Sequence, residues 1–589
     1  MRSFIYRAAI AATVLAQLAI AVPHGDDEHM GMDMDMDMDM GGGRAATSSP
    51  SAAPPDDGPM SYFAYSKHTG AIMAHIALMM LAWCIVLPAA VMLSVARSRL
   101  ALPSQLLFLL VNGFGMLLGI VYNSQTPDLY ENNAHHKIGW IATWVFSAQA
   151  VLALIFTYAG RGESSTDKDA YEHAAFLPVA TDDHEHTYPA HATHGYRWSR
   201  DSGQGTEPGS PTHDTSSSSS FNSPVECDDG FEKPEAELPV QPTPRRGWLH
   251  STFVDRFLSN RVPGLVSNRV LRIFNGLYNV VDRIILPFGF VAIATGAVTY
   301  GGIMRDREIF NGLAHFIKGG IFFWYGALTL GRYVGCWADL GWAWNKKPPA
   351  SIVGWKAKVP TGEFTESFVI FLYGITNVFL EHLGGNGQWS ATDLEHVSIS
   401  VMFFGGGLVG MLFESSRIRE TMNSTILRTP AHVGRDERWQ TPKSQGVSLN
   451  PMPALIILLL GMMMGSHHQT SMTSTMVHKQ WGNMLMGFSL ARGMTYVLLF
   501  LRPPTSYLPA RPPTEIVASF CLMSGGLIFM LSTRNVIEAM EYYDVDAMFT
   551  FTVGMGFTAF IMALEILSIA LKAWAVKREH RPQLGFHFP

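Results

Sequence analysis

The stretch HIALMMLAWCIVLPAAVML, from His75 to Leu93, contains no acidic residue, lysine or arginine. About 20 apolar residues are enough to cross the hydrocarbon core of a bilayer as a helix, in which every backbone polar group finds a partner. The sequence therefore predicts an all-α, polytopic helical membrane protein. About eleven spans of this kind are expected, at 71–96, 104–122, 136–160, 284–301, 310–336, 366–383, 396–414, 452–465, 481–501, 515–532 and 547–575.

The composition is typical of an integral membrane protein and argues against two other classes. Of the 589 residues, 48% are hydrophobic and only 15% are charged, whereas about a quarter of the residues in a soluble protein are charged. The net charge of −6 leaves no concentrated basic face, so no nucleic acid is expected as a partner. The four cysteines suggest no disulfide framework. The lipid bilayer is the partner that the sequence predicts directly.

The N-terminus has the layout of a secretory signal peptide over residues 1–21. Arg2 and Arg7 precede an apolar run that ends near Ala21, and the shortness of this run favours a cleaved signal over a membrane span. Residues 22–66 are rich in Met, Asp, Gly, Ser and Pro, so we expect a disordered lumenal tail. Two interpretations stay open for this tail: thioether capture of a cuprous ion, and a solvated low-complexity leader.

The loop charges orient the chain, because Lys and Arg collect on the cytosolic side of membrane proteins. They predict a lumenal or extracellular N-terminus and a cytosolic C-terminus, in an integral protein of the endomembranes, the vacuole or the plasma membrane. Residues 161–247, rich in Ser and Pro, are then a disordered cytosolic linker. The basic residues on the predicted cytosolic side are Arg97, Arg99, Lys346, Lys347, Lys356, Lys358, Arg417, Arg419, Arg428, Arg435, Arg438, Lys443, Arg502, Arg511, Lys577, Arg578 and Arg581.

A run of Met and His, MMMGSHHQTSMTSTMVH from Met462 to His478, separates two apolar segments on the predicted lumenal side. Imidazole and thioether groups are ligands for copper and zinc. A second lumenal hairpin returns its own His and Glu to the same depth, so the two hairpins together predict a transition-metal site. Alternatively, the histidines are polar helix ends and Met fills apolar space. The expected ligands are Glu381, His382, Glu395, His396, His467, His468, Met472, Met476 and His478.

Two charges lie deep inside predicted spans, where charges usually pair or line a polar path. Arg492 is near the middle of its span, and Glu565 is well inside the last one. We expect these two side chains to form an ion pair, with a translocation path as the alternative. No nucleophile motif, phosphate-binding loop or soluble catalytic domain appears, so no catalytic residue is predicted and an enzymatic role is less favoured.

Two histidine elements mark the starts of helices in the region 67–160. His75 begins the apolar stretch quoted above, and His135 and His136 open the third span in the sequence HHKIG. This pattern resembles the transmembrane b-type cytochromes that reduce metals with ascorbate. The resemblance implies one haem b near the lumenal face, held by His75 with His135 or His136. The second helix has no His, so the alternative is a pair of interfacial histidines in a degenerate cytochrome-like fold.

The region 248–589 carries a second resemblance. Its stretches FNGLAHFIKGGIFFWYGALTLGRYVGCWADLGWAWN (Phe310 to Asn345) and FLYGITNVFLEHLGG (Phe371 to Gly385), with the Met and His run, resemble the fungal Ytp-like family, named for a yeast protein regarded as a transporter. This resemblance implies a fungal integral membrane protein, and the family's name is not evidence of transport. From the residues we expect a lumenal copper or zinc site, and Arg492, Glu565 and the number of spans favour a metal transporter. The alternatives are a single-haem redox protein and a non-catalytic scaffold or sensor. The sequence specifies no protein partner.

Overall fold

The computed structural model describes residues 61–159, 268–305, 308–383, 391–426, 442, 446–467 and 469–579. Within these ranges the regular structure is helical and no strand occurs, which confirms the all-α fold class. The predicted signal peptide and the linker 161–247 lie outside the described residues, as does the expected tail before residue 61.

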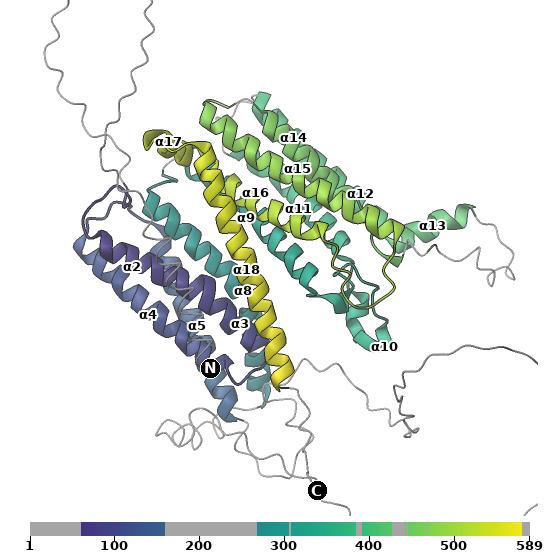
Figure 1. Ribbon diagram of the computed structural model, residues 1–589, viewed down its shortest axis with the longest axis horizontal. Helices are drawn as coiled ribbons and strands as arrows, with labels where there is room; N and C mark the ends of the chain where they lie inside the picture. The colour runs from purple at the N-terminus through teal and green to yellow at the C-terminus, as the bar shows by residue number, and fades with distance from the viewer. Residues whose placement is uncertain are drawn as a thin grey trace, which may run out of the picture. The chain divides into compact units, whose positions relative to one another are not determined.

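The helices keep close to the predicted apolar segments (Figure 1). In chain order they are α2 (Thr69–Met80), the π-helix η1 (Leu81–Val86), α3 (Leu87–Val95), α4 (Ala101–Gln125), α5 (Ala134–Ala159), α8 (Asn268–Gly301), α9 (Glu308–Val334), the short 3₁₀ turn η2 (Ala338–Leu340), α10 (Ala350–Val353), the 3₁₀ turn η3 (Gly354–Lys358), α11 (Gly362–Leu383), α12 (Ala391–Glu414), α13 (Ser416–Ile426), α14 (Met452–Ser466), α15 (Met472–Leu501), α16 (Thr514–Leu531), α17 (Arg534–Tyr542) and α18 (Ala547–Glu579).

Eight helical stretches of the described part are long and apolar enough to cross a membrane. They are the continuous run α2–η1–α3, α4, α5, most of α8, most of α12, α15, α16 and α18. Three further helices, α9, α11 and the shorter α14, coincide with the other expected spans. The membrane character of the chain is therefore confirmed, whereas the exact count of eleven spans is not.

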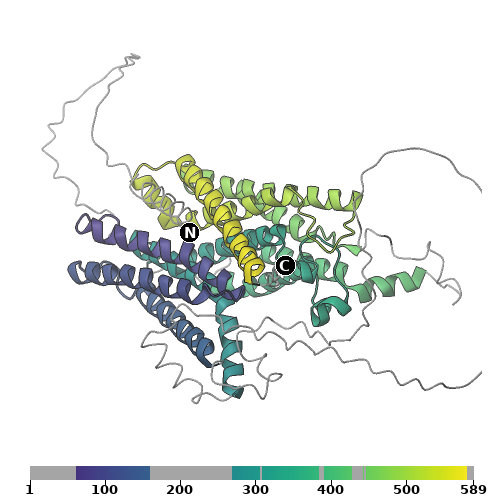
Figure 2. The same cartoon turned by 60° about the horizontal axis from the view of Figure 1, so that its bottom comes forward.

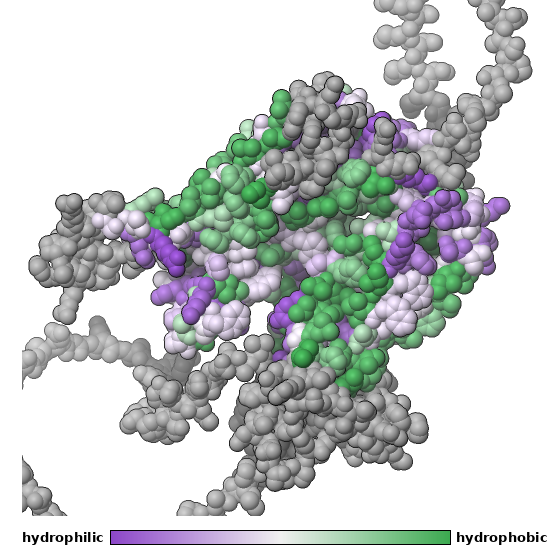
Figure 3. All heavy atoms as spheres, turned by 180° about the vertical axis from the view of Figure 1, so that it is seen from behind, coloured by the Kyte–Doolittle hydropathy of each residue, from purple (hydrophilic) through white to green (hydrophobic). Residues whose placement is uncertain are grey.

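The helix α4 shows how an apolar sequence builds a bundle in lipid. Its polar residues Gln105 and Asn112 are buried, while Leu110, Phe114 and Leu117 are about half exposed. Residues spaced three or four apart share a helix face, so α4 turns a polar face inward and an apolar face outward. Figure 3 shows the apolar surface that such outward faces form on one side of the molecule.

The interior of the N-terminal bundle, which we define as α2, η1, α3, α4, α5 and α8, is filled with aromatic rings. Trp83 lies in the widened π-turn just before Pro88, a residue that cannot donate a backbone hydrogen bond. Its indole Nε1 donates to Asn112 Oδ1 at 3.0 Å. Beside it, Phe108 and Phe146 have ring centres 4.3 Å apart. Figure 2 shows the purple helices of this bundle side by side.

The C-terminal bundle, which we define as α9, α11, α12, α14, α15 and α16, is held together by close helix crossings. A Cβ added to Gly319 of α9 would lie 2.5 Å from the backbone oxygen of Gly526 in α16. A Cβ at Gly407 of α12 would collide with the backbone of Phe371 in α11. Only glycine allows these backbones to approach so closely. The glycine run 405–407 therefore includes a packing position.

The last helix, α18, contacts both groups of helices. It packs against α3 of the N-terminal bundle and against α9 and α16 of the C-terminal bundle (Figure 1). Residues 61–66, which we expected to belong to the tail, also contact the helices. Tyr62 is buried and its hydroxyl accepts a hydrogen bond from the Leu129 amide at 3.2 Å, and the Phe63 amide donates to the Tyr300 carbonyl.

Candidate functional site

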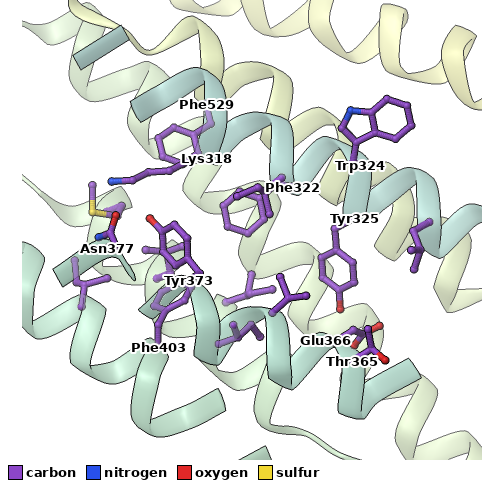
Figure 4. Close-up of a pocket in the computed structure, with 18 of the residues that line it drawn as sticks. Lys318, Phe322, Trp324, Tyr325, Thr365, Glu366, Tyr373, Asn377, Phe403 and Phe529 are labelled. Carbon is purple, nitrogen blue, oxygen red and sulfur yellow. The ribbon is translucent and has the colours of Figure 1, made fainter. Parts of the chain in front are cut away.

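A cavity of about 380 Å³ lies inside the C-terminal bundle; we call it the central cavity. Figure 4 shows its two polar ends, with Lys318, Asn377 and Tyr373 at one end and Glu366 with Thr365 at the other. The long wall between these ends is apolar and aromatic, with Phe322, Phe403, Trp481 and Phe529 among its residues. Space of this size and lining suits a small organic molecule.

The rings of the aromatic wall pack on one another, and one of them carries an unsatisfied hydrogen-bond donor among the described residues. The rings of Trp481 and Phe529 stack with centres 4.2 Å apart, and Tyr373 packs edge to face on Phe403 at 5.2 Å. Trp481 is fully buried, yet its Nε1–H has no hydrogen-bond partner among the described residues. A buried indole normally finds such a partner, so the Trp481 Nε1–H is an unusual unsatisfied donor.

Five buried charged residues form a network at the Glu366 end of the central cavity; we call Arg332, Glu363, Glu366, Arg492 and Glu515 the charge network. Arg332 Nη1 donates to Glu366 Oε1 at 2.5 Å, and Arg332 Nη2 donates to Glu363 Oε1 at 2.6 Å. Its Nε donates to the Trp342 carbonyl at 2.6 Å. Arg332 thus links Glu366, which lines the central cavity, to Glu363, which does not.

Arg492 completes the network from α15. Its Nη1 lies 3.2 Å from Glu366 Oε2, and its Nε lies 2.8 Å from Glu515 Oε1. Arg492 and Glu515 are both fully buried. The predicted pair of Arg492 with Glu565 is therefore corrected: Arg492 pairs with Glu366 and Glu515. Glu565 instead lies on α18 near Gly331, where an added Cβ would be 3.8 Å from its Oε1.

Helix ends explain why these charges lie here. Glu363 is in the first turn of α11 and Glu515 in the first turn of α16, while Arg332 is in the last turn of α9. Carboxylates are stabilised at helix N-termini and guanidinium groups at C-termini. Glu366 follows Glu363 by three residues and therefore shares its helix face. The helix dipoles therefore stabilise Glu363, Glu515 and Arg332 at these positions.

A second cavity, of about 110 Å³, borders the network from the side of the loops after α9 and α12; we call it the end cavity. Arg332, Glu363, Lys347 and Ser448 are among its lining residues. Trp344, which also lines it, has φ 50° in the left-handed region, an unusual conformation for a bulky residue. The Trp344 ring lies 4.3 Å from the Arg332 guanidinium carbon. The charge network thus stands between two cavities.

The predicted metal residues are brought together only in part. His467 Nδ1 lies 3.3 Å from Glu395 Oε2, so residues of both predicted hairpins do meet. His478 is buried, with its Nδ1 2.8 Å from the Ser474 carbonyl oxygen. His396 lines the central cavity. The described residues hold no group of three or more His, Cys, Asp or Glu able to bind a metal ion.

The remaining predicted metal residues do not add to this contact. Met472 and Met476 have exposed side chains. The side chains of Glu381 and His382, and the residue His468, lie outside the described residues. The structure also adds a histidine that sequence reasoning missed, because the rings of His315 in α9 and His478 have centres 6.4 Å apart.

The two histidines expected to bind haem face one another in the N-terminal bundle. The rings of His75 and His135 have centres 6.5 Å apart. His75 Nδ1 lies 2.8 Å from the Gly115 carbonyl oxygen, and His135 Nδ1 lies 3.1 Å from the Ala292 carbonyl oxygen. Metal-binding histidines commonly donate one ring nitrogen to a carbonyl and use the other for the metal.

Room for these two rings comes from glycines. A Cβ on Gly119 would lie 2.9 Å from the His75 ring, and one on Gly296 would lie 2.9 Å from the His135 ring. Two imidazoles on opposite sides of one metal ion, each about 2 Å from it, have ring centres about 6 Å apart. The observed separation of the two ring centres, 6.5 Å, is close to this value. His136 is exposed, so the structure favours His135 as the partner of His75.

The other half of the N-terminal bundle has no such pair among its described residues and holds a hydrogen-bonded polar network instead. Ser94 Oγ donates to Asp282 Oδ2 at 2.7 Å, and the Gln149 amide donates to Asp282 Oδ1. The Tyr278 hydroxyl accepts from Gln105 at 2.7 Å. Between this network and the histidines lie the aromatic rings around Trp83. The described polar side chains of this half thus bond to one another.

Sequence reasoning missed the charge network except for Arg492. Arg332, Glu363, Glu366 and Glu515 stand at the ends of predicted spans, where charges usually reach water. One signal was available: Glu363 and Glu366 sit three residues apart at the start of an apolar segment. That spacing places two carboxylates on one face, yet only the tertiary structure shows that both are buried.

Comparison with known proteins shows that most of the chain is similar to fungal membrane proteins. Residues 288–573 match the family described as "Protein YTP1-like, C-terminal", and residues 56–159 match a domain of unknown function, DUF2427. The chain is 32% identical to "Uncharacterized membrane protein C3B8.06" of Schizosaccharomyces pombe over 519 residues, which cover 87% of this chain and 96% of that protein.

Two proteins of Saccharomyces cerevisiae are similar over shorter lengths. "Uncharacterized membrane protein YCR061W" is 40% identical over 315 residues, 51% of this chain and 49% of that protein. "Protein YTP1" is 24% identical over 275 residues, 46% of this chain and 49% of that protein. No solved structure matches the chain.

Proposed function

The chain belongs to the YTP1-like family of membrane proteins, and we propose that its C-terminal bundle transports a small organic solute through the central cavity. The observation that carries this proposal is the position of the charge network between two cavities. A solute held against the aromatic wall has a polar barrier on one side and, beyond Arg332, a second cavity. A barrier between two cavities is the arrangement that a carrier needs.

The lining argues for an organic solute in preference to a bare metal ion. Its long wall is aromatic, and Glu366 is already engaged by Arg332 and Arg492. Aromatic faces stabilise flat or cationic organic groups. Copper and zinc instead favour imidazole, thiolate and carboxylate ligands. The expected metal site therefore belongs to the predicted lumenal hairpins, at the contact of Glu395 with His467, and stays a separate prediction.

The test compares two substitutions on one helix. Thr365→Trp would fill the central cavity, whereas Thr376→Trp adds the same bulk at an exposed position of α11. The full chain is reconstituted in liposomes loaded with a small-molecule cell extract, and mass spectrometry identifies the compounds that leave. We expect a set of compounds to leave with the wild type and Thr376→Trp but not with Thr365→Trp. Equal release by the wild type and Thr365→Trp would contradict transport through this cavity.

A second function is favoured by the His75 and His135 pair, which fits a single haem b. A haem supplies one-electron transfer when bound. The backbone carbonyls of Gly115 and Ala292 would hold the two imidazoles in position. Since the described residues of the other half hold Asp282 and its hydrogen-bond donors in place of a second histidine pair, we propose that such a redox centre serves one membrane face.

An absorbance spectrum of the purified full chain tests the haem. We expect a Soret band that is lost in His75→Ala and in His135→Ala but kept in His136→Ala, because His136 is exposed and is not the partner of His75. Protein that remains monodisperse yet shows no Soret band after expression with haem precursor would overturn the haem proposal.

A further inference from the structure

The corrected pairing of Arg492 leaves Glu565 as a separate acidic group deep inside α18. It is the only charged residue between Asp546 and Lys572, and α18 is long and apolar enough to cross a membrane. At about 1.5 Å per residue, Glu565 lies about 27 Å along the helix from Ala547 and about 10 Å from Lys572. Its carboxyl is therefore well inside the span and closer to the C-terminal end of α18.

The surroundings of Glu565 give its carboxyl no partner in the described part of the chain. Its oxygens take part in no hydrogen bond or ion pair there. A Cβ added to Gly331 of α9 would lie 3.8 Å from Glu565 Oε1. One turn earlier on α18, Met562 is buried in an apolar cluster with Leu330 of α9 and Met523 of α16. An unpaired carboxylate is costly in such surroundings, so the neutral acid is the favoured form.

Two other buried glutamates of the C-terminal bundle show the contrast. Glu366 contacts both Arg332 and Arg492, and Glu515 contacts Arg492. These guanidinium groups hold the two carboxylates in their ionised form. Glu565 forms no ion pair with a described residue, so nothing comparable stabilises its negative charge.

We propose that Glu565 binds a proton inside the membrane and that this proton is coupled to transport by the C-terminal bundle. Proton binding stands on the position of Glu565 alone, whereas the coupling rests on the transport function proposed above. α18 packs against α9 and α16 (Figure 1). Gly331, beside the Glu565 carboxyl, directly precedes Arg332 of the charge network. A proton that binds or leaves thus changes the charge beside the turn of α9 that holds Arg332 between the two cavities.

The proton exchanges with water at the C-terminal end of α18. Lys572 lies two turns after Glu565 on the same helix face, and the Cys336 thiol interacts electrostatically with both residues. The proton that leaves passes to water at this end, and loss of the proton is favoured as the pH rises. The titratable groups of the neighbouring elements are Arg332 and Tyr333 at the end of α9, Cys336 after it, Glu515 and Cys521 of α16, and Lys572 of α18, while α3 has none and α15 reaches α18 at Ala547.

Dicyclohexylcarbodiimide, an apolar reagent, tests proton binding in the full chain. It reacts with a neutral carboxylic acid: the carboxyl oxygen bonds to the central carbon of the reagent and the proton moves to its nitrogen, so no group leaves. At neutral pH, mass spectrometry should find Glu565 labelled and Glu366 unlabelled. Glu565→Gln should lose this label, and the matched control Glu538→Gln, on an exposed position of α17, should keep it. Glu565 that stays unlabelled, or that a water-soluble carbodiimide labels equally well, would overturn the proposal.

The extract-loaded liposomes described above test the coupling. For one proton per solute, a pH difference of one unit sustains about a tenfold concentration difference of the solute. We expect such a shift for the wild type and Glu538→Gln, and its loss in Glu565→Gln. Release by the wild type that ignores the pH difference would overturn the coupling. Release that Thr365→Trp does not block would overturn transport through the central cavity, while the carbodiimide label on Glu565 would still report proton binding.

Discussion

The N-terminal and C-terminal bundles bury polar groups in different ways. In the N-terminal bundle, Asp282 is surrounded by hydrogen-bond donors from Ser94 and Gln149 and no cavity is needed to explain its position. In the C-terminal bundle, two arginines and three glutamates form buried ion pairs beside the central cavity. A hydrogen-bonded carboxylate is a stable structural element, whereas a chain of shared ion pairs can exchange partners. We therefore assign the proposed transport to the C-terminal bundle.

The largest effect is expected from removing one cation of the charge network. Arg492→Met leaves Glu515 buried without its partner, which should cost about 3–5 kcal/mol of unfolding free energy. The same change at Arg283→Met, on an exposed position of α8 in the other bundle, should have little effect. Unfolding of the purified proteins in a denaturing-detergent titration measures both. Equal stability of the two variants would remove the distinction between the bundles.

Helix contact in the C-terminal bundle should show the next largest effect. Gly319→Ala drives a methyl group into the Gly526 carbonyl, and overpacking of this kind costs about 1–3 kcal/mol. Gly139→Ala in the N-terminal bundle has open space around the new Cβ and serves as the control. Thermal unfolding in detergent compares the two. A larger drop in melting temperature for Gly139→Ala than for Gly319→Ala would contradict the close packing of α9 against α16 at Gly319.

A smaller effect is expected for the hydrogen-bonded network around Asp282 in the N-terminal bundle. Asp282→Asn keeps the shape of the side chain but opposes an amide donor to Gln149 or Ser94, which should cost about 1–2 kcal/mol. The measurement is the same detergent titration, with the conservative Ser104→Ala, which removes a partly buried bond to the Ala101 carbonyl, as a reference. A loss as large as that of Arg492→Met would mean that Asp282 also belongs to a charged network.

The smallest effect is expected at the predicted metal hairpins. Glu395 and His467 are partly exposed, so Glu395→Gln should change the stability of metal-free protein by less than about 1 kcal/mol. If the two hairpins bind zinc or copper(II), added metal should stabilise the wild type and not His467→Ala. Elemental analysis of purified protein gives the stoichiometry. Metal that binds both proteins equally would contradict a site built on this contact.

The sequence predicted most of the membrane helices, because each one is recognisable from the hydropathy of its own segment. An apolar run needs about 20 residues to cross the bilayer, and this length is visible without any knowledge of packing. The spans around Leu87 and Phe108 were placed this way, whereas His75 with His135 or His136 came from a resemblance to b-type cytochromes. The structure pairs the imidazole of His135, and not that of His136, with His75, because consecutive residues point about 100° apart around a helix and only one of the two rings faces inward.

The partners of charged side chains were decided by tertiary structure alone. Local sequence showed that Arg492 is intramembrane and must find a carboxylate, but several glutamates were available to it, and the choice of Glu366 and Glu515 over Glu565 depends on which helices become neighbours. The central cavity likewise has no local signature, because its walls come from helices far apart in the chain. Hydropathy is a property of a segment, so the sequence determined the membrane helices; ion pairing and cavities are properties of neighbouring helices, so only the packed bundle determined them.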